Sequence, residues 1–174
     1  MNFELEKSLE ILERTPDVIT DMLRGLSTDW TSANEGEGTW SAYDVVGHLV
    51  HGEKTDWVPR TEVILSAQSE RRFEPFNRFA QFEESRGKSL HDLLTEFKQL
   101  RQKNLAHLRS KGITNKDLQK TGTHPDFGDV TLSQLLSTWV VHDLNHIAQI
   151  SRVMAKHYKD DVGPWIEYLR ILKS

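Results

Sequence analysis

Residues 137–150 read Ser-Thr-Trp-Val-Val-His-Asp-Leu-Asn-His-Ile-Ala-Gln-Ile, and their spacing indicates both the architecture and the chemistry of this chain. An α-helix turns by about 100° per residue, so apolar residues three and four apart share one face. That face comprises Leu132, Leu135, Leu136, Trp139, Ile147, Ile150, Val153 and Met154. His146 falls within it and His142 on its flank. The segment predicts a long amphipathic helix with two histidines on its inward side.

Similar apolar spacing recurs in three other segments, whereas strand patterns are scarce. Capping boxes mark the start of three helices, which we expect over residues 41–67, over 89–109 and from 131 onward. The paired residues are Ser41 with Asp44, Ser89 with Asp92, and Thr131 with Gln134.

Proline and glycine divide the rest of the chain. The first helix is expected over residues 3–26, with a kink or restart at Thr15-Pro16, and the second should bend before Pro59. Residues 121–130 have turn chemistry throughout, and Gly163-Pro164 should begin a short closing helix.

Four long amphipathic helices in 174 residues most economically form a four-helix bundle. No Gly/Ser/Pro-rich linker, repeat or low-complexity tract divides the chain. We therefore expect an all-α bundle with a short C-terminal helix, as a single domain over residues 1–174. The core of such a bundle is a usual place for metal ligands from facing helices.

The composition restricts the partners. Net charge is −4 and no basic stripe occurs, which argues against nucleic acid and anionic membranes. The sequence shows neither a signal-peptide pattern nor an apolar run of roughly 18 residues, so we expect a cytoplasmic protein. Cysteine is absent, which excludes disulfides, thiolate ligands and a protein thiol nucleophile.

His142 and His146 are four residues apart, which on a helix places them about 40° apart around the axis and roughly 6 Å along it. Two such imidazoles can reach one metal ion, and a third ligand must come from a neighbouring helix. Helical geometry places His48 at the inward edge of the second helix and His51 nearer to solvent. We therefore predict a metal site of His48, His142 and His146; the alternative is that they are ordinary hydrogen-bonded core residues.

The remaining histidines are weaker candidates. His91, His107 and His157 are expected on the surface. His124 precedes the fourth helix, where it would either approach the mouth of the site or cap a turn.

Two carboxylates interrupt the apolar pattern, Glu53 on the second helix and Asp143 on the fourth. Buried carboxylates need partners. They would orient a ligand histidine, accept a hydrogen bond from the indole of Trp40 or Trp139, or pair with a buried arginine. Gln149, three residues after His146, is a further candidate to line the same cavity.

Three imidazoles without a carboxylate or thiolate leave the full charge on the ion and at least one coordination position open. Imidazole ligation favours zinc first and nickel second.

The motifs resemble those of the DinB-like, or YfiT-like, metal-binding four-helix bundles. The matching segments are Arg14-Thr-Pro, Gly38-Thr-Trp-Ser-Ala-Tyr-Asp-Val-Val-Gly-His-Leu-Val-His-Gly-Glu, His124-Pro-Asp-Phe-Gly-Asp-Val-Thr-Leu, and Trp139-Val-Val-His-Asp-Leu-Asn-His-Ile-Ala-Gln-Ile. Carried over by position, the resemblance implies that His48, His142 and His146 are the metal ligands.

Activities within this family differ. The resemblance implies either a thiol-dependent S-transferase, which would need a low-molecular-weight thiol as cosubstrate, or a metal-dependent hydrolase, in both cases acting on a small molecule. It also suggests a homodimer. The rival hypothesis is a non-catalytic bundle with a structural metal or a pocket for a small ligand; a fourth protein ligand would favour a structural ion.

Overall fold

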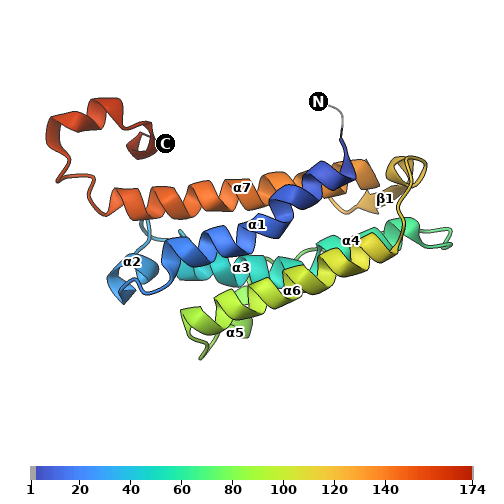
Figure 1. Cartoon of the computed structure of the whole chain (residues 1–174), viewed down its shortest axis with the longest axis horizontal. Helices are drawn as coiled ribbons and strands as arrows, with labels where there is room; N and C mark the ends of the chain where they lie inside the picture. The colour runs from blue at the N-terminus through green and yellow to red at the C-terminus, as the bar shows by residue number, and fades with distance from the viewer. Residues whose placement is uncertain (1–2, 174) are drawn as a thin grey trace.

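The computed structural model describes residues 3–173, so residues 1, 2 and 174 of the expected domain lie outside the description. The predicted all-α four-helix bundle is confirmed (Figure 1). Its long helices are α1 (Leu5–Leu23), α3 (Ala42–Thr55) continued by α4 (Trp57–Leu65), α6 (Leu90–Ser110) and α7 (Leu132–Lys156). Two short helices lie in the connections, α2 (Thr28–Ser32) and α5 (Ala80–Glu84).

All three capping boxes form as predicted. Ser41, Ser89 and Thr131 are the N-caps of α3, α6 and α7, and each accepts a hydrogen bond from the backbone N–H three residues later. Local sequence therefore sets where three of the four bundle helices begin.

The two prolines within helices act differently. The predicted bend before Pro59 is present, because α3 ends at Thr55 and α4 begins at Trp57. By contrast, α1 continues through Pro16 without the restart that we considered. Thr15 does not cap a new helix; its hydroxyl donates to the Ile11 carbonyl at 3.1 Å. Because Pro16 has no N–H, it cannot donate to the Leu12 carbonyl.

The turn-rich segment before α7 is a β-hairpin, which departs from the purely helical expectation. Strand β1 (Thr121–His124) pairs antiparallel with β2 (Gly128–Thr131), and His124 lies opposite Gly128. Gly128 has φ of +71°, a conformation that favours glycine. Strands of four residues are too short to show a clear alternating pattern in the sequence.

The connection from α4 to α6 is fixed at two places. Near its start, the Phe73 N–H donates to the Thr123 carbonyl of β1 at 3.0 Å. Near its end, α5 packs on α3 at Gly47, where an added Cβ would lie 2.5 Å from the Ser85 hydroxyl oxygen. Both ends of residues 73–85 therefore contact other elements, β1 at Phe73 and α3 at Ser85.

Past α7, the expected C-terminal helix consists of two 3₁₀ segments, Gly163–Tyr168 and Arg170–Leu172. No helix within residues 3–173 has the length and apolar character needed to cross a membrane.

The core consists of two apolar clusters. One includes Leu12, Leu105 and Trp139, and the other includes Ile19, Phe97 and Ile150. Along α3, α6 and α7, buried polar residues lie in the sequence between the members of the two clusters. They are His51, Glu53, Arg101, Asn104, Asp143 and His146.

Candidate metal centre

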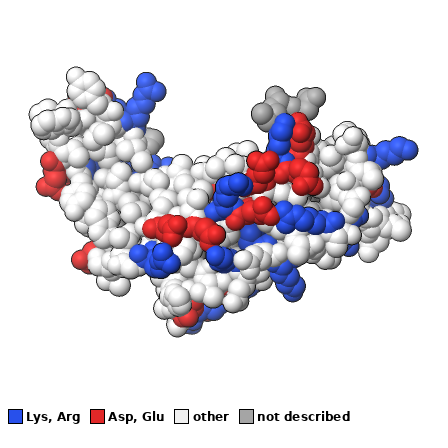
Figure 2. All heavy atoms as spheres, viewed as in Figure 1, with Lys and Arg blue, Asp and Glu red and all other residues white. Residues whose placement is uncertain are grey.

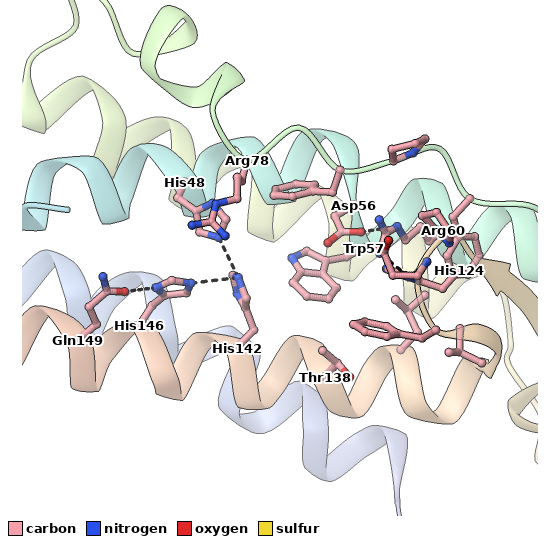
Figure 3. Close-up of a pocket in the computed structure, with 18 of the residues that line it drawn as sticks. His48, Asp56, Trp57, Arg60, Arg78, His124, Thr138, His142, His146 and Gln149 are labelled. Atoms are coloured by element: carbon pink, nitrogen blue, oxygen red, sulfur yellow. Dashed lines mark hydrogen bonds and ion pairs between the residues drawn. The ribbon is translucent and has the colours of Figure 1, made fainter. Parts of the chain in front are cut away.

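His48 from α3 and His142 and His146 from α7 come together as a group, called here the histidine triad. The Nε2 atom of His142 lies 3.0 Å from Nε2 of His48 and 3.1 Å from Nε2 of His146 (Figure 3). One nitrogen from each ring lies within 4.8 Å of those of the other two. Among residues 3–173, no carboxylate or fourth histidine joins this group. The structure thus brings together the three histidines that helical spacing selected.

The triad side chains are largely buried. His48 and His146 are buried and His142 is half-buried. Burial, reinforced by the neighbouring histidines, lowers the pKa of His48 to about 3 and that of His142 to about 2. Burial also lowers the pKa of His146. The rings are neutral at physiological pH, which is the form that binds metal.

Gln149 orients one of the rings. The Nδ1–H of His146 donates to Gln149 Oε1 at 2.8 Å, so the His146 Nε2 lone pair points into the triad. The Nδ1 atoms of His48 and His142 are buried and have no hydrogen-bond partner among the described residues.

These side chains fit a divalent metal. Ligand nitrogens around a tetrahedral zinc ion, with bonds of about 2.0–2.1 Å, are roughly 3.3 Å from one another. The two Nε2 separations of 3.0 and 3.1 Å are close to this spacing. Three neutral nitrogen donors and no other ligand correspond to a site with an open position.

The two inward carboxylates belong to a separate group, called here the Arg101 cluster, which consists of Glu53, Arg101, Asn104 and Asp143. Arg101 donates to Glu53 Oε1 from Nε at 3.0 Å and to Asp143 Oδ2 from Nη1 at 2.6 Å. Asn104 donates to Glu53 Oε2 at 2.9 Å. Neither carboxylate is hydrogen-bonded to a triad histidine. Of the roles considered, pairing with a buried arginine is the one that both adopt.

Two further contacts complete this cluster. The Trp139 indole N–H donates to Glu53 Oε1 at 3.1 Å, and Arg101 Nη1 donates to the Leu12 carbonyl at 2.7 Å. That carbonyl is the one that Pro16 leaves without a helical N–H. Burial alone would lower the pKa of Arg101, but the charges of Glu53 and Asp143 outweigh it and raise that pKa.

The prediction that His51 lies on the surface is wrong. His51 is buried, and its Nδ1 lies 2.9 Å from Glu84 Oε1 of α5. His91, His107 and His157 are exposed as predicted. His124 adopts the turn-capping role that we considered. It lines the cavity described next, and its Nδ1 accepts the Asp126 N–H at 3.1 Å within the hairpin turn.

A cavity of about 860 Å³ opens beside the triad. Its walls include Trp40, Trp57 and Phe76, together with residues of the hairpin. The Trp57 ring stacks on Trp139, with centroids 5.7 Å apart, and meets His142 edge-on at 5.1 Å. All three triad histidines line this cavity.

Several residues of the cavity wall carry no recognisable signal in the sequence. Arg78 and the pair Asp56–Arg60 line the cavity, yet no motif or periodicity marks them. Arg101 was detectable in principle, because it lies four residues from both Phe97 and Leu105 and so falls on the apolar face of α6.

Comparison with known proteins places this architecture in a family. The family model of the DinB superfamily matches residues 11–150. The chain belongs to the DinB superfamily. A comparison with curated protein sequences finds no match to this chain.

Three solved structures share the fold. YfiT from Bacillus subtilis, described as a probable metal-dependent hydrolase with an unusual four-helix bundle topology, superposes with a TM-score of 0.75 at 21% identity, covering 88% of this chain and 87% of YfiT. A DinB-like protein from Bacillus cereus ATCC 10987 gives 0.59 at 20%, covering 90% and 95%. TT2238, a four-helix bundle protein, gives 0.57 at 19%, covering 85% and 98%. At these identities the likeness supports the fold alone.

Proposed function

We propose that this DinB superfamily member is a divalent-metal-dependent enzyme that hydrolyses a small molecule, with the ion held by His48, His142 and His146. The observation that carries this proposal is the convergence of three neutral Nε2 atoms on the wall of a large cavity, with no fourth ligand among residues 3–173. A structural zinc site is normally closed by four protein ligands, whereas a catalytic site keeps one position open. The description of YfiT as a probable metal-dependent hydrolase is consistent with this reaction class.

When bound, a divalent ion supplies Lewis acidity that makes water or a thiol nucleophilic near neutral pH. The residues of the chain provide the environment for that chemistry. Trp40 and Trp57 exclude water from one side of the triad, and Gln149 holds the His146 ring in one tautomer and orientation. Zinc remains our first choice of ion and nickel the second.

Thiol transfer is a second candidate, favoured by the size of the cavity. At about 860 Å³, it lies near the upper end of the range of roughly 300–1,000 Å³ seen for small-molecule sites. That volume offers room for a low-molecular-weight thiol beside a second substrate. Because the chain has no cysteine, the thiol must come from outside.

The deciding experiment is elemental analysis of untagged protein purified without chelator or nickel resin. We expect about one zinc or nickel ion per chain, lost in His142→Ala/His146→Ala and retained in the control His91→Ala/His107→Ala, which removes two exposed histidines of α6. Circular dichroism should show all three proteins folded. Stoichiometric metal in the triad variant would overturn the ligand assignment.

If wild-type protein bound no metal even after reconstitution, the histidines would be pocket residues and the chain a binding module. With metal restored, ester and amide substrates tested with and without added thiol separate hydrolysis from thiol transfer. Turnover that requires the thiol would favour the transferase.

A further inference from the structure

Arg78 stands beside the triad at the cavity wall (Figure 3). It lies in the connection between α4 and α5, between the anchor at Phe73 and the packing of α5 on α3. Its guanidinium carbon lies 5.9 Å from the ring centre of Trp40, and the Trp40 ring lies 4.8 Å from that of His48. The structure thus places an arginine next to the proposed metal ligands, on a segment whose two ends contact β1 and α3.

The arginines of the cavity wall differ in their partners. Arg60 Nε lies 2.6 Å from Asp56 Oδ1. Arg152 makes two hydrogen bonds of 2.8 Å to the carboxylate of Glu35. Arg78 makes contacts with the rings of Trp40 and Phe79, but no hydrogen bond or ion pair to any residue in the described part of the chain. It is the cavity arginine whose charge is left uncompensated.

Arg78 is exposed, so water solvates its guanidinium in the absence of a ligand and the group is available to bind an anion. Three neutral histidines leave the full positive charge on a bound divalent ion, and the guanidinium on the same cavity wall supplies a second positive charge. A carboxylate bound at this wall would be attracted by both charges. The planar fork of a guanidinium also matches the geometry of a carboxylate.

The rest of the wall indicates what the carboxylate would be attached to. Trp57 is buried and held by its stacking on Trp139, while Trp40 and Phe76 face the same space, with Phe76 edge-on to His48 at 5.6 Å. Rigid aromatic surfaces favour a flat apolar group.

We propose that Arg78 is a substrate-binding residue that pairs with a carboxylate, and that the substrate is a small carboxylic acid with a flat apolar body. This inference rests on the proposed metal enzyme and specifies its substrate class. It assigns Arg78 to recognition and leaves metal binding to the triad.

The test uses two pairs of probes with nearly equal shape, benzoate against benzamide and phenylacetate against phenylacetamide. Binding is measured by calorimetry on zinc-loaded and on metal-free full-length protein. Wild-type protein should prefer each acid over its amide. Arg78→Gln should weaken binding of the acids by about 10- to 100-fold, the range for hydrogen bonds to charged groups, and leave the amides unchanged.

Arg86→Gln is the matched control. It removes the same charge from an exposed arginine just after α5, which pairs with Glu83 and does not line the cavity. This variant should bind the acids like wild type. An equal loss in both variants would mean a general charge effect and would overturn the inference.

Three further outcomes test whether Arg78 binds a carboxylate. Failure of the wild-type protein to prefer acids over amides overturns the inference, and so does a preference that needs zinc but not Arg78. An Arg78-dependent preference that persists in metal-free protein supports it, even if elemental analysis contradicts the metal site. Failure of this inference and failure of the proposed function are therefore distinguishable.

Discussion

The histidine triad and the Arg101 cluster draw on the same two helices, α3 and α7, yet they meet their hydrogen-bonding needs in opposite ways. In the cluster, Arg101 donates to Glu53, Asp143 and the Leu12 carbonyl. In the triad, nitrogen atoms face nitrogen atoms, and two Nδ1 atoms have no partner among residues 3–173. Buried polar groups normally have hydrogen-bond partners within the protein. The paired groups of the Arg101 cluster therefore have a structural role, whereas the unpaired nitrogens of the triad are available to bind a ligand.

The surroundings of the two groups support the same distinction. The Arg101 cluster is enclosed by protein, and Figure 2 shows that charged side chains elsewhere lie in mixed patches along the surface of the bundle. The triad opens onto the cavity. Asp143 lies directly after His142 in sequence but turns toward the other group. Sequence proximity therefore does not assign a residue to a function here.

The largest effect should come from breaking the structural group. Arg101→Met leaves Glu53 and Asp143 buried without their cation, and we expect the free energy of unfolding, measured in urea, to fall by about 3–5 kcal/mol. The triple variant Glu53→Gln/Arg101→Met/Asp143→Asn removes every charge together and should regain much of that loss. A cost below about 1 kcal/mol for Arg101→Met would contradict the structural role.

The pH dependence of the stability of the metal-free protein should show the effect of burying the triad histidines. Burial lowers the pKa of His48 to about 3 and that of His142 to about 2, from 6.5. Below pH 6.5 the unfolded chain takes up protons that the folded chain does not. The free energy of unfolding therefore decreases as the pH decreases. Two such histidines should cost about 2–3 kcal/mol of unfolding free energy between pH 7.5 and 5.5.

The control for the titration is His48→Gln/His142→Gln, which removes both groups and keeps hydrogen-bonding side chains. Carboxylates titrate equally in the two proteins, so the difference between their stabilities isolates the histidines. A difference that stays constant from pH 7.5 to 5.5 would show that these rings are not held neutral by burial.

Local sequence predicted most of the fold because the signals were local. Capping boxes at Ser41, Ser89 and Thr131 and apolar spacing set the starts and faces of the helices. Pro59 placed the bend. The hairpin was missed because its strands have four residues each, and the outcome at Pro16 depended on Arg101, a residue distant in sequence that uses the free Leu12 carbonyl.

The error at His51 also comes from a contact that is distant in sequence. Helical geometry locates a residue relative to the long bundle helices, whereas His51 is covered by α5 through its contact with Glu84. The covering helix α5 comes from the irregular connection, and its approach depends on Gly47, so sequence periodicity gave no sign of it. Arg78 lies on the same connection and was missed for the same reason. Segments without periodicity can be placed only by their tertiary contacts.

A moderate effect is expected at the hydrogen bond from His146 to Gln149. Gln149→Ala removes the acceptor of His146 Nδ1–H and should weaken zinc affinity by about 10- to 100-fold, measured by competition with a chelator. Asn145→Ala, an exposed change one turn earlier on α7, is the control and should have no effect. Gln149→Glu keeps an acceptor and should retain the affinity. Equal affinities of wild type and Gln149→Ala would contradict the orienting role.

The smallest effect is expected at His51. This residue tests whether a buried histidine that has a hydrogen-bond partner is structural and takes no part in metal binding. His51 is as buried as His48, and it lies three residues further along α3, but its Nδ1 is paired with Glu84. Because it has this partner, His51 is expected to be structural, like the residues of the Arg101 cluster. His51→Ala should lower the unfolding free energy by only about 1 kcal/mol and leave the metal content of purified protein unchanged, whereas His48→Ala should lose the metal. Loss of metal from His51→Ala would mean that a satisfied histidine also serves the site, and the contrast between the triad and the Arg101 cluster would then no longer identify function.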